Sequence, residues 1–206
     1  MKGSITVAHY FEPEPSETGR DLRVIDVVFQ QQSYSFLTDS GVFSKRRLDF
    51  GSRLLLETVA IGEAKEILDL GCGYGPIGLI IAATHPKVHV TMVDVNPRAI
   101  ELAKQNAKRN RVQAQTSICV SDGFASISHR FFDLVLFNPP IRAGKAVVYR
   151  LFAETKQHLN PGGRLVIVIR KQQGAVSAQK ELTRLYPQVE VLKQKKGYWV
   201  LQATMI

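Results

Sequence analysis

The stretch EILDLGCGYGPIGLIIAATH, residues 66–85, decides the fold. Its first five residues form an apolar run typical of a buried strand, and its last ten read as a helix that begins at Pro76. Between them lie Gly71, Gly73 and Gly75, which let the backbone turn tightly and approach a ligand closely. The stretch therefore predicts a strand, a glycine-rich turn and a helix, which is the opening unit of an α/β domain.

Downstream of this unit, apolar strand-like runs alternate with helical patterns, and a hairpin closes the chain. The predicted strands are 66–70, 88–94, 116–120, 132–138, 164–170, 188–194 and 198–204, and the predicted helices are 76–85, 97–110, 147–159 and 175–186. The turn NPGG, residues 160–163, should end the third of these helices. The pattern predicts a Rossmann-like α/β fold with a seven-stranded, mostly parallel sheet, helices on both faces and a C-terminal antiparallel hairpin. Ligands of such folds bind beyond the carboxyl ends of the strands.

Upstream, the sequence predicts a smaller β-rich segment. Residues 23–39 read as two short strands around a polar turn, and residues 52–60 as a helix. We expect residues 1–50 to form an extension that packs on the catalytic core, and residues 51–206 to form the main domain.

The composition of the 206-residue chain is that of a globular protein, with 45% apolar and 22% charged residues. No apolar run approaches the ~20 residues of a membrane span, and the N-terminus lacks the apolar region of a secretory signal. The two cysteines, Cys72 and Cys119, give neither a disulfide framework nor a metal-ligand pattern. We therefore expect a cytoplasmic protein with no membrane association and no metal.

The formal charge of +9 is concentrated in the last third of the chain. Residues 144–206 contain 11 basic and 3 acidic side chains, a net charge of +8. A concentrated basic surface favours a polyanion such as RNA, although a solvated basic face with no partner has the same composition.

Two classes of nucleotide cofactor use a glycine-rich turn of this kind. Asp94 ends a predicted strand 19 residues beyond Gly75, where a carboxylate can accept hydrogen bonds from both ribose hydroxyls. Gly73, Gly75 and Gly78 also satisfy the G-x-G-x-x-G spacing of NAD-binding enzymes, but that match is weak by itself.

Two further carboxylates favour S-adenosylmethionine over NAD. Asp69 lies two residues before Gly71, where a carboxylate suits a cationic, amino-acid-bearing ligand better than a pyrophosphate. Asp122, in the segment SDGF after strand 116–120, could accept a hydrogen bond from the adenine amino group. Either aspartate could instead cap a helix or a turn. The joint pattern nevertheless predicts S-adenosylmethionine.

The stretch DLVLFNPPIRAGK, residues 133–145, ends an apolar strand on asparagine and two prolines. Pro139 and Pro140 restrict the backbone and hold Asn138 in place. The Asn138 side-chain carbonyl and a backbone carbonyl would then be two acceptors for a planar, conjugated amino group. Such positioning leaves the nitrogen lone pair available for a methyl group. The alternative is a strand that the prolines simply end.

These motifs resemble class I S-adenosylmethionine-dependent methyltransferases from about residue 48 to the end. The segments HYFEPEP (9–15) and SFLTDSGVFSKRRLDFGSRLLLE (35–57) are similar to the family of 16S ribosomal RNA guanine-N2 methyltransferases. The resemblance implies methylation of a guanine N2 in 16S rRNA or the small ribosomal subunit, by a single-domain member that is a monomer or a homodimer. It assigns the acceptor amino group to Asn138, Pro139 and Pro140, and S-adenosylmethionine to Asp69, Gly71, Gly73, Gly75, Asp94, Asp122 and Asn138.

One departure concerns the substrate side of this resemblance. Many amino-methyltransferases have an aromatic residue after the two prolines that stacks on the target base, and this sequence has Ile141. A flipped base would then contact Ile141 or an aromatic residue from elsewhere, such as Phe43. Arg142 and Lys145 are candidates for phosphate or base contacts. For Phe36, another candidate, core packing is the favoured interpretation.

Three alternatives stay open. One is an N-methyltransferase that acts on adenine in RNA or DNA, or on a protein glutamine. Another is a methyltransferase-like module that binds RNA without catalysis, and a third is an NAD-dependent oxidoreductase. Within the basic third of the chain, we expect the RNA to contact Lys193, Lys195 and Lys196.

Overall fold

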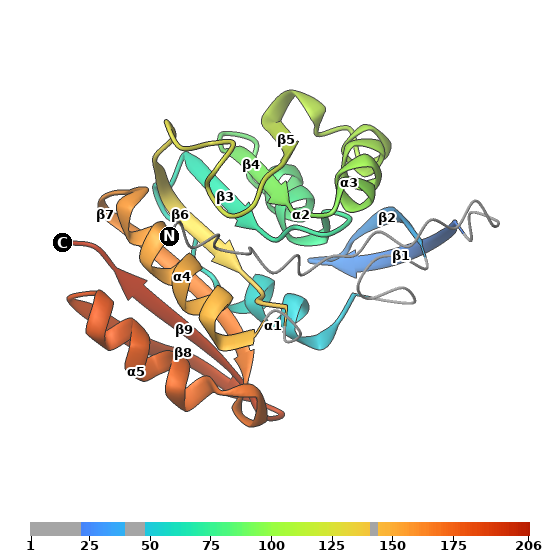
Figure 1. Cartoon of the computed structure of the whole chain (residues 1–206). Coiled ribbons are helices and arrows are strands. Elements are labelled where there is room, and N and C mark those ends of the chain that lie inside the picture. The colour runs from blue at the N-terminus through green and yellow to red at the C-terminus, as the bar shows by residue number, and fades with distance from the viewer. Residues whose placement is uncertain (1–21, 40–47, 141–143) are drawn as a thin grey trace, which may run out of the picture.

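The computed structural model describes residues 22–39, 48–140 and 144–206, and Figure 1 shows a central sheet flanked by helices. The seven strands have the order β5-β4-β3-β6-β7-β9-β8. The first five along the chain are parallel to one another, and β9 runs antiparallel to both of its neighbours, β7 and β8. The predicted fold class is therefore confirmed. The strands are β3 (Glu66–Leu70), β4 (His89–Asp94), β5 (Thr116–Val120), β6 (Phe132–Phe137), β7 (Leu159–Arg170), β8 (Gln188–Lys195) and β9 (Tyr198–Thr204).

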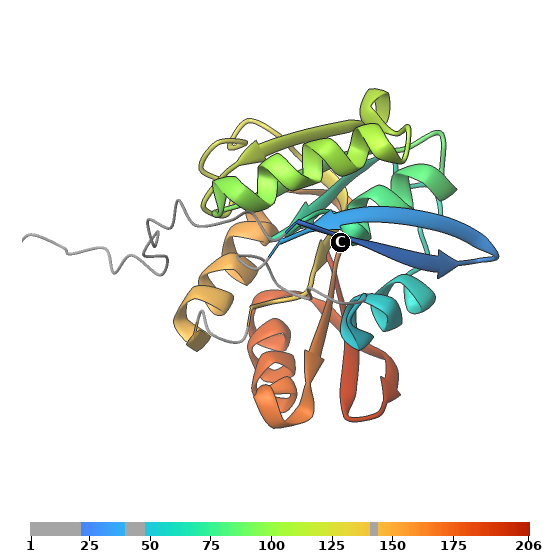
Figure 2. The same ribbon diagram turned by 90° about the vertical axis from the view of Figure 1, so that its right-hand side faces the viewer.

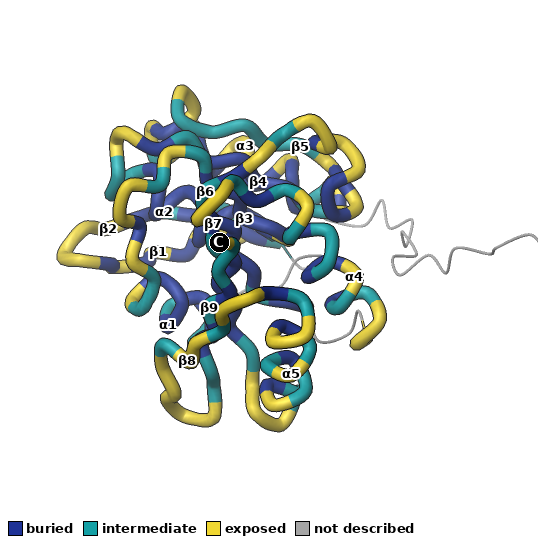
Figure 3. The backbone as a smooth tube through the Cα atoms, turned by 90° about the vertical axis from the view of Figure 1, so that its left-hand side faces the viewer, coloured by how far each residue is buried: buried dark blue, intermediate teal, exposed yellow. Residues whose placement is uncertain are grey.

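Helices cover both faces of this sheet. One apolar cluster joins the sheet to α1 (Phe50–Thr58), α2 (Pro76–Thr84) and α3 (Pro97–Arg109), and a second joins it to α4 (Gly144–Gln157) and α5 (Ala175–Leu185). Figure 2 shows α4 and α5 on one side of the sheet and α1 on the other. Successive strand residues face opposite helix layers, so the central strands are apolar on both faces and lie in the buried interior of Figure 3.

The change in strand order occurs between β3 and β6. The chain passes from β3 outward to β4 and β5 and then returns to β6 on the other side of β3. In the parallel register Leu70 pairs with Phe137. The residues that follow these two strands, Gly71 and Asn138, are consequently neighbours at the edge where ligands of such sheets bind.

A two-stranded antiparallel hairpin, β1 (Arg23–Phe29) and β2 (Gln32–Thr38), lies outside the main sheet. Two side chains of α3 hold it. Asn106 Oδ1 accepts a hydrogen bond from Leu37 N at 2.6 Å, and Asn106 Nδ2 donates to Leu37 O and to Tyr74 O, each at 2.9 Å. Asn110 makes the same pair of contacts with the backbone of Ser35. Asn106 thereby connects the hairpin to the glycine-rich loop.

The predicted turn at residues 160–163 is wrong, because this segment belongs to β7. Phe132 pairs with Leu159 and Leu134 pairs with Arg164, so β7 has extra residues opposite one step of β6. The irregular segment is held by Asn160, whose Nδ2 donates to Asp133 Oδ1 at 2.7 Å. Helix α4 also begins at Gly144, three residues before its predicted start at 147.

Over the described ranges, the structure contains no helix long and apolar enough to cross a membrane. The division of the chain at residue 50 stays a prediction.

Candidate active site

The glycine-rich loop after β3 forms the floor of the candidate site. Gly73 and Gly75 have φ values of +57° and +98°, which side chains rarely adopt. Among the described residues, a Cβ atom on Gly73 would meet no atom within 4 Å, whereas one on Gly75 would lie 2.9 Å from both Leu79 Cδ1 and Met92 Cε. Gly73 therefore borders open space, and Gly75 is required for the loop to pack on α2 and β4.

Asp69 and Asp94 place two carboxyl groups beside this loop. Asp69 is 1% exposed, and its Oδ2 accepts a hydrogen bond from Gly78 N at 2.8 Å. Burial raises the pKa of Asp69 to about 7, against the lowering effect of the Gly78 N–H, and the charge of Asp94 raises it further. A carboxyl group in this state would be stabilised in its ionised form by a cation.

Asp94 is fixed by backbone groups on both sides. Its Oδ2 accepts from Gly73 N at 2.8 Å, and its Oδ1 accepts from Asn96 N at 2.9 Å. Burial raises the pKa of Asp94, and these N–H groups offset part of the effect. Each carboxylate oxygen has a second lone pair, so Asp94 can still accept hydrogen bonds from a pair of hydroxyl groups.

These groups fit the predicted cofactor. S-adenosylmethionine is a cationic nucleoside with vicinal hydroxyls, and the site offers the buried carboxyl group of Asp69 and the half-buried one of Asp94 beside the glycine-rich loop. Asp122 lies in the loop after β5, where its side chain is 61% exposed and bonded to Arg150 of α4. Asp122 still has free lone pairs in this arrangement and could accept a further hydrogen bond. Its contact with adenine stays a prediction.

Asn138, directly after β6, has a defined amide orientation. Its Nδ2 donates to Ser52 Oγ at 3.0 Å and approaches Asp49 Oδ1 at 3.4 Å. Both acceptors belong to the first turn of α1, on the same side of the sheet as Asp69. Within the described residues, no hydrogen bond occupies the Asn138 side-chain carbonyl. Its role as the acceptor for a substrate amino group stays a prediction.

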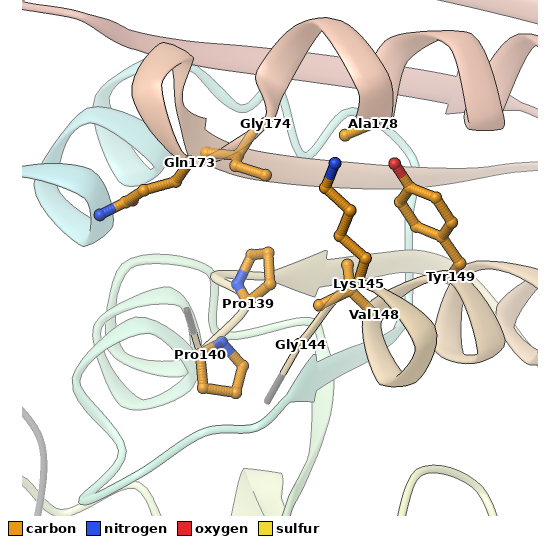
Figure 4. A pocket seen from close by; sticks show the side chains of 10 residues that line it. Pro139, Pro140, Gly144, Lys145, Val148, Tyr149, Gln173, Gly174 and Ala178 are labelled. Carbon is orange, nitrogen blue, oxygen red and sulfur yellow. The ribbon is translucent and has the colours of Figure 1, made fainter. Parts of the chain in front are cut away.

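Beside Asn138, the two prolines line a small cavity of about 60 Å³ between α4 and the start of α5. Figure 4 shows Pro139 and Pro140 on one side and the Lys145 side chain extending toward Gly174 and Ala178. Lys145, at the start of α4, is thus close to the motif, and its role in binding substrate stays a prediction.

Three predicted substrate residues, Phe43, Ile141 and Arg142, lie outside the described residues. Phe36 is fully buried and packs edge-on against Tyr74, with ring centroids 6.0 Å apart, which confirms its core role.

The sequence did not predict the side chains that hold Asn138 and the glycine-rich loop in place. Ser52 and Asp49 contact Asn138, and Asn106 holds the glycine-rich loop through Tyr74 O. Two local features were visible in the sequence, since Ser52 lies two residues before the apolar run LLL and an asparagine interrupts the buried face of α3, but neither feature indicates which residue the side chain contacts.

Known proteins resemble the chain over most of its length. The sequence profile of the methyltransferase small domain family matches residues 33–202. The uncharacterized protein YbxB of Bacillus subtilis is 42% identical over 200 residues, which cover 96% of this chain and 98% of that protein. Ribosomal RNA large subunit methyltransferase G of Photobacterium profundum is 35% identical over 170 residues, which cover 80% of this chain and 45% of that protein.

A solved structure shows the same fold. The T. thermophilus 16S rRNA N2 G1207 methyltransferase, in complex with AdoMet and guanosine, matches with a TM-score of 0.81 at 24% identity, over 93% of this chain and 52% of that one. The chain thus spans about half the length of these two methyltransferases. Because the family profile covers most of the sequence, the protein belongs to the methyltransferase small domain family, and its predicted class, an S-adenosylmethionine-dependent methyltransferase, is confirmed.

Proposed function

We propose that this methyltransferase modifies the exocyclic N2 amino group of a guanine in 16S rRNA. The observation that supports the proposal is the amide of Asn138, whose NH2 contacts Ser52 and Asp49 and whose carbonyl accepts no hydrogen bond from the described residues. An exocyclic amino group has two N–H donors, so it can pair with the carbonyl edge of the Asn138 amide and not with its NH2 edge.

Asn138 acts by orientation in this proposal. Its side-chain carbonyl and a backbone carbonyl of the Asn-Pro-Pro segment accept the two N–H bonds of the amino group. Pro139 and Pro140 keep these acceptors in place because each fixes its own φ angle. The nitrogen lone pair is then directed away from both acceptors. Positioning of this kind supplies a large part of a catalytic barrier reduction, and the methylated nitrogen is acidic enough to lose its proton without a strong base.

S-adenosylmethionine, when bound, supplies an activated methyl group on a sulfonium centre. In our proposal Asp69 faces the cationic amino-acid part, Asp94 accepts from the ribose hydroxyls and Asp122 from the adenine. Gly71, Gly73 and Gly75 let the backbone approach the ligand. The support is the burial of Asp69 and the hydrogen bonding of Asp69 and Asp94 beside Gly73.

Three observations support rRNA as the substrate. The last third of the chain has a net charge of +8, two of the similar proteins are named for rRNA methylation, and residues 35–57 resemble the guanine-N2 family. A ribosomal substrate would place the enzyme in the cytoplasm. One relative is named for the large subunit, so 23S rRNA is the second candidate.

Methyl transfer from labelled S-adenosylmethionine tests this function. The acceptors are undermodified 30S subunits, naked 16S rRNA, 23S rRNA, duplex DNA and a protein extract, followed by nucleoside or amino-acid analysis. We expect N2-methylguanine in 16S rRNA or in subunits. Label in 23S rRNA, adenine or glutamine would contradict the proposal that the acceptor is a guanine of 16S rRNA. Binding of RNA with no label in any acceptor would contradict the proposal that the protein is catalytically active.

Asn138→Ala should lower transfer at least about 100-fold, because it removes the fixed acceptor. The affinity for S-adenosylmethionine, measured by calorimetry, should stay within about twofold, the change expected where only a weak contact is lost. A variant that kept the wild-type rate would contradict the role of Asn138.

A further inference from the structure

We infer that Ser52, together with Asp49, is a positioning residue that sets which edge of the Asn138 amide faces the substrate. The inference rests on the proposed chemistry at an amino group. It assigns to the first turn of α1 a function in the reaction, which is distinct from its packing on the sheet.

The residues that contact Asn138 lie at the start of α1. Asp49 is the N-cap residue, and its Oδ1 accepts a hydrogen bond from Ser52 N at 3.0 Å. This bond fixes both the carboxylate and the first helical turn. The Ser52 hydroxyl, in a residue that is 4% exposed, then lies 3.0 Å from Asn138 Nδ2. The two acceptors, Asp49 Oδ1 and Ser52 Oγ, thus come from the same end of α1 and contact the amide of Asn138, which follows β6.

Gly51 gives this turn its close packing. A Cβ atom there would lie 3.1 Å from Asp49 Oδ1 and 3.1 Å from Tyr198 Cε1 of β9. Even a methyl group at this position would be in tight contact with both, so Asp49 or Tyr198 would have to shift by a few tenths of an ångström. The small residue therefore keeps Asp49 and Ser52 where they meet Asn138.

The chemistry of the three groups permits one amide orientation. An ionised carboxylate only accepts hydrogen bonds, so the edge of Asn138 that faces Asp49 must be the NH2 edge. Ser52 Oγ accepts from the same NH2 group and completes its hydrogen bonding. If the amide were turned over, its NH2 would face the amino group of the substrate, and two donors would oppose each other. The first turn of α1 thus excludes the unproductive orientation.

A matched pair of substitutions isolates the hydroxyl group. Threonine and valine have nearly the same shape, and only threonine keeps an oxygen that can accept from Asn138. We expect Ser52→Thr to keep kcat within about threefold of wild type, whereas Ser52→Val should lose about 10- to 100-fold in kcat. The Kd for S-adenosylmethionine, the KM for RNA and the thermal unfolding midpoint should be the same in the two variants. Equal kcat values for the pair, high or low, would overturn the inference.

A second variant keeps the test valid if the extra methyl groups disturb folding. Ser52→Ala adds no bulk, and it should lower kcat with an unchanged Kd for S-adenosylmethionine. A wild-type kcat in this variant would also overturn the inference. The outcome is separate from that of the proposed function, because the wild-type acceptor is identified first. If the wild type methylates adenine or glutamine, the guanine assignment fails and the same variants still test Ser52 on that amino group.

Discussion

Asp69 is a carboxyl group that the fold buries at the end of β3, where Gly78 N–H is its hydrogen-bond donor. Burial favours the neutral form, and the nearby Asp94 adds repulsion, so the pKa of Asp69 rises from 3.8 to about 7. A cationic ligand would reverse this preference. Near neutral pH, Asp69 consequently lowers the free energy of unfolding of the ligand-free protein. The same carboxylate would increase the affinity for a cationic cofactor.

The sign of the stability effect follows from the direction of the pKa shift. Between about pH 4 and pH 7 the folded protein holds the Asp69 proton and the unfolded chain has lost it. The free energy of unfolding should therefore fall as the pH rises through this window, and this contribution should be constant above about pH 7. Urea unfolding at several pH values measures it, and Asp69→Asn should have a flatter profile in the same window.

The same proton should control cofactor affinity. Because the ionised form of Asp69 is the one that attracts a cation, the affinity for S-adenosylmethionine should rise with pH up to about 7 and then level off. Calorimetry on the wild type and on Asp69→Asn measures the effect, since the variant retains every other titrating group. Parallel pH profiles for the two proteins would mean that Asp69 does not face the cationic part of the ligand.

At the scale of elements, the loop between β3 and α2 joins the cofactor site to the core. Its Gly73 borders open space, and its Gly75 lies against Leu79 of α2 and Met92 of β4. The loop therefore has one face for a ligand and one for packing. A change at Gly75 should disturb both, because α2 also carries the N–H that binds Asp69.

Gly75→Ala should lower the free energy of unfolding by about 1–3 kcal/mol from overpacking alone, with backbone strain at positive φ in addition. Gly62→Ala is the matched control, since Gly62 also has positive φ but a Cβ atom there would meet nothing. Chemical denaturation should show a clearly larger loss for Gly75→Ala, and only this variant should also bind S-adenosylmethionine more weakly. Equal losses would show that strain, rather than contact with Leu79 and Met92, decides the effect.

The sequence predicted the elements of the main sheet and the residues at their ends, because strand and helix periods are local signals. Asp94 and Asn138 were selected as candidates in this way, and their roles stay predictions. The contacts of Ser52 with Asn138 and of Asn106 with Leu37 were not predictable, since each joins residues far apart in the sequence with no shared local pattern. The segment 160–163 was mistaken for a turn because its proline and glycines have the same composition as a bulged strand.

At the scale of the whole molecule, positive charge and the candidate active site share one side of the sheet. Exposed Lys195 ends β8, and exposed Lys196 lies in the turn that follows, where its Nζ is 5.4 Å from the ring centre of Phe50 in α1. Arg170, at the end of β7, lies over Tyr198 at 4.8 Å. Both contacts surround the first turn of α1, which holds Asn138. An RNA bound to this basic surface would therefore pass close to the Asn-Pro-Pro motif.

Replacing Lys193, Lys195 and Lys196 together by alanine should weaken RNA binding and reduce its dependence on salt. Each lost phosphate contact should lower the slope of log K against log salt by about 0.7–0.9. The control removes three exposed charges, Lys104, Lys108 and Arg109, from α3 near the opposite end of the sheet (Figure 1). Filter binding over a salt series compares the two triple variants. Equal slopes would exclude the β8–β9 turn as the specific RNA surface.

The two asparagines of α3 have a consequence for self-association. Ser35 and Leu37 offer N–H and C=O groups on the side of β2 that faces away from β1, and such an outer row can recruit a strand from another molecule. Asn106 and Asn110 occupy those groups with side-chain amides, which imitate a neighbouring strand without extending the sheet. The hairpin is thereby protected against intermolecular β-pairing along this row. Asn106, which also contacts the cofactor loop through Tyr74 O, thus helps to protect the protein against aggregation.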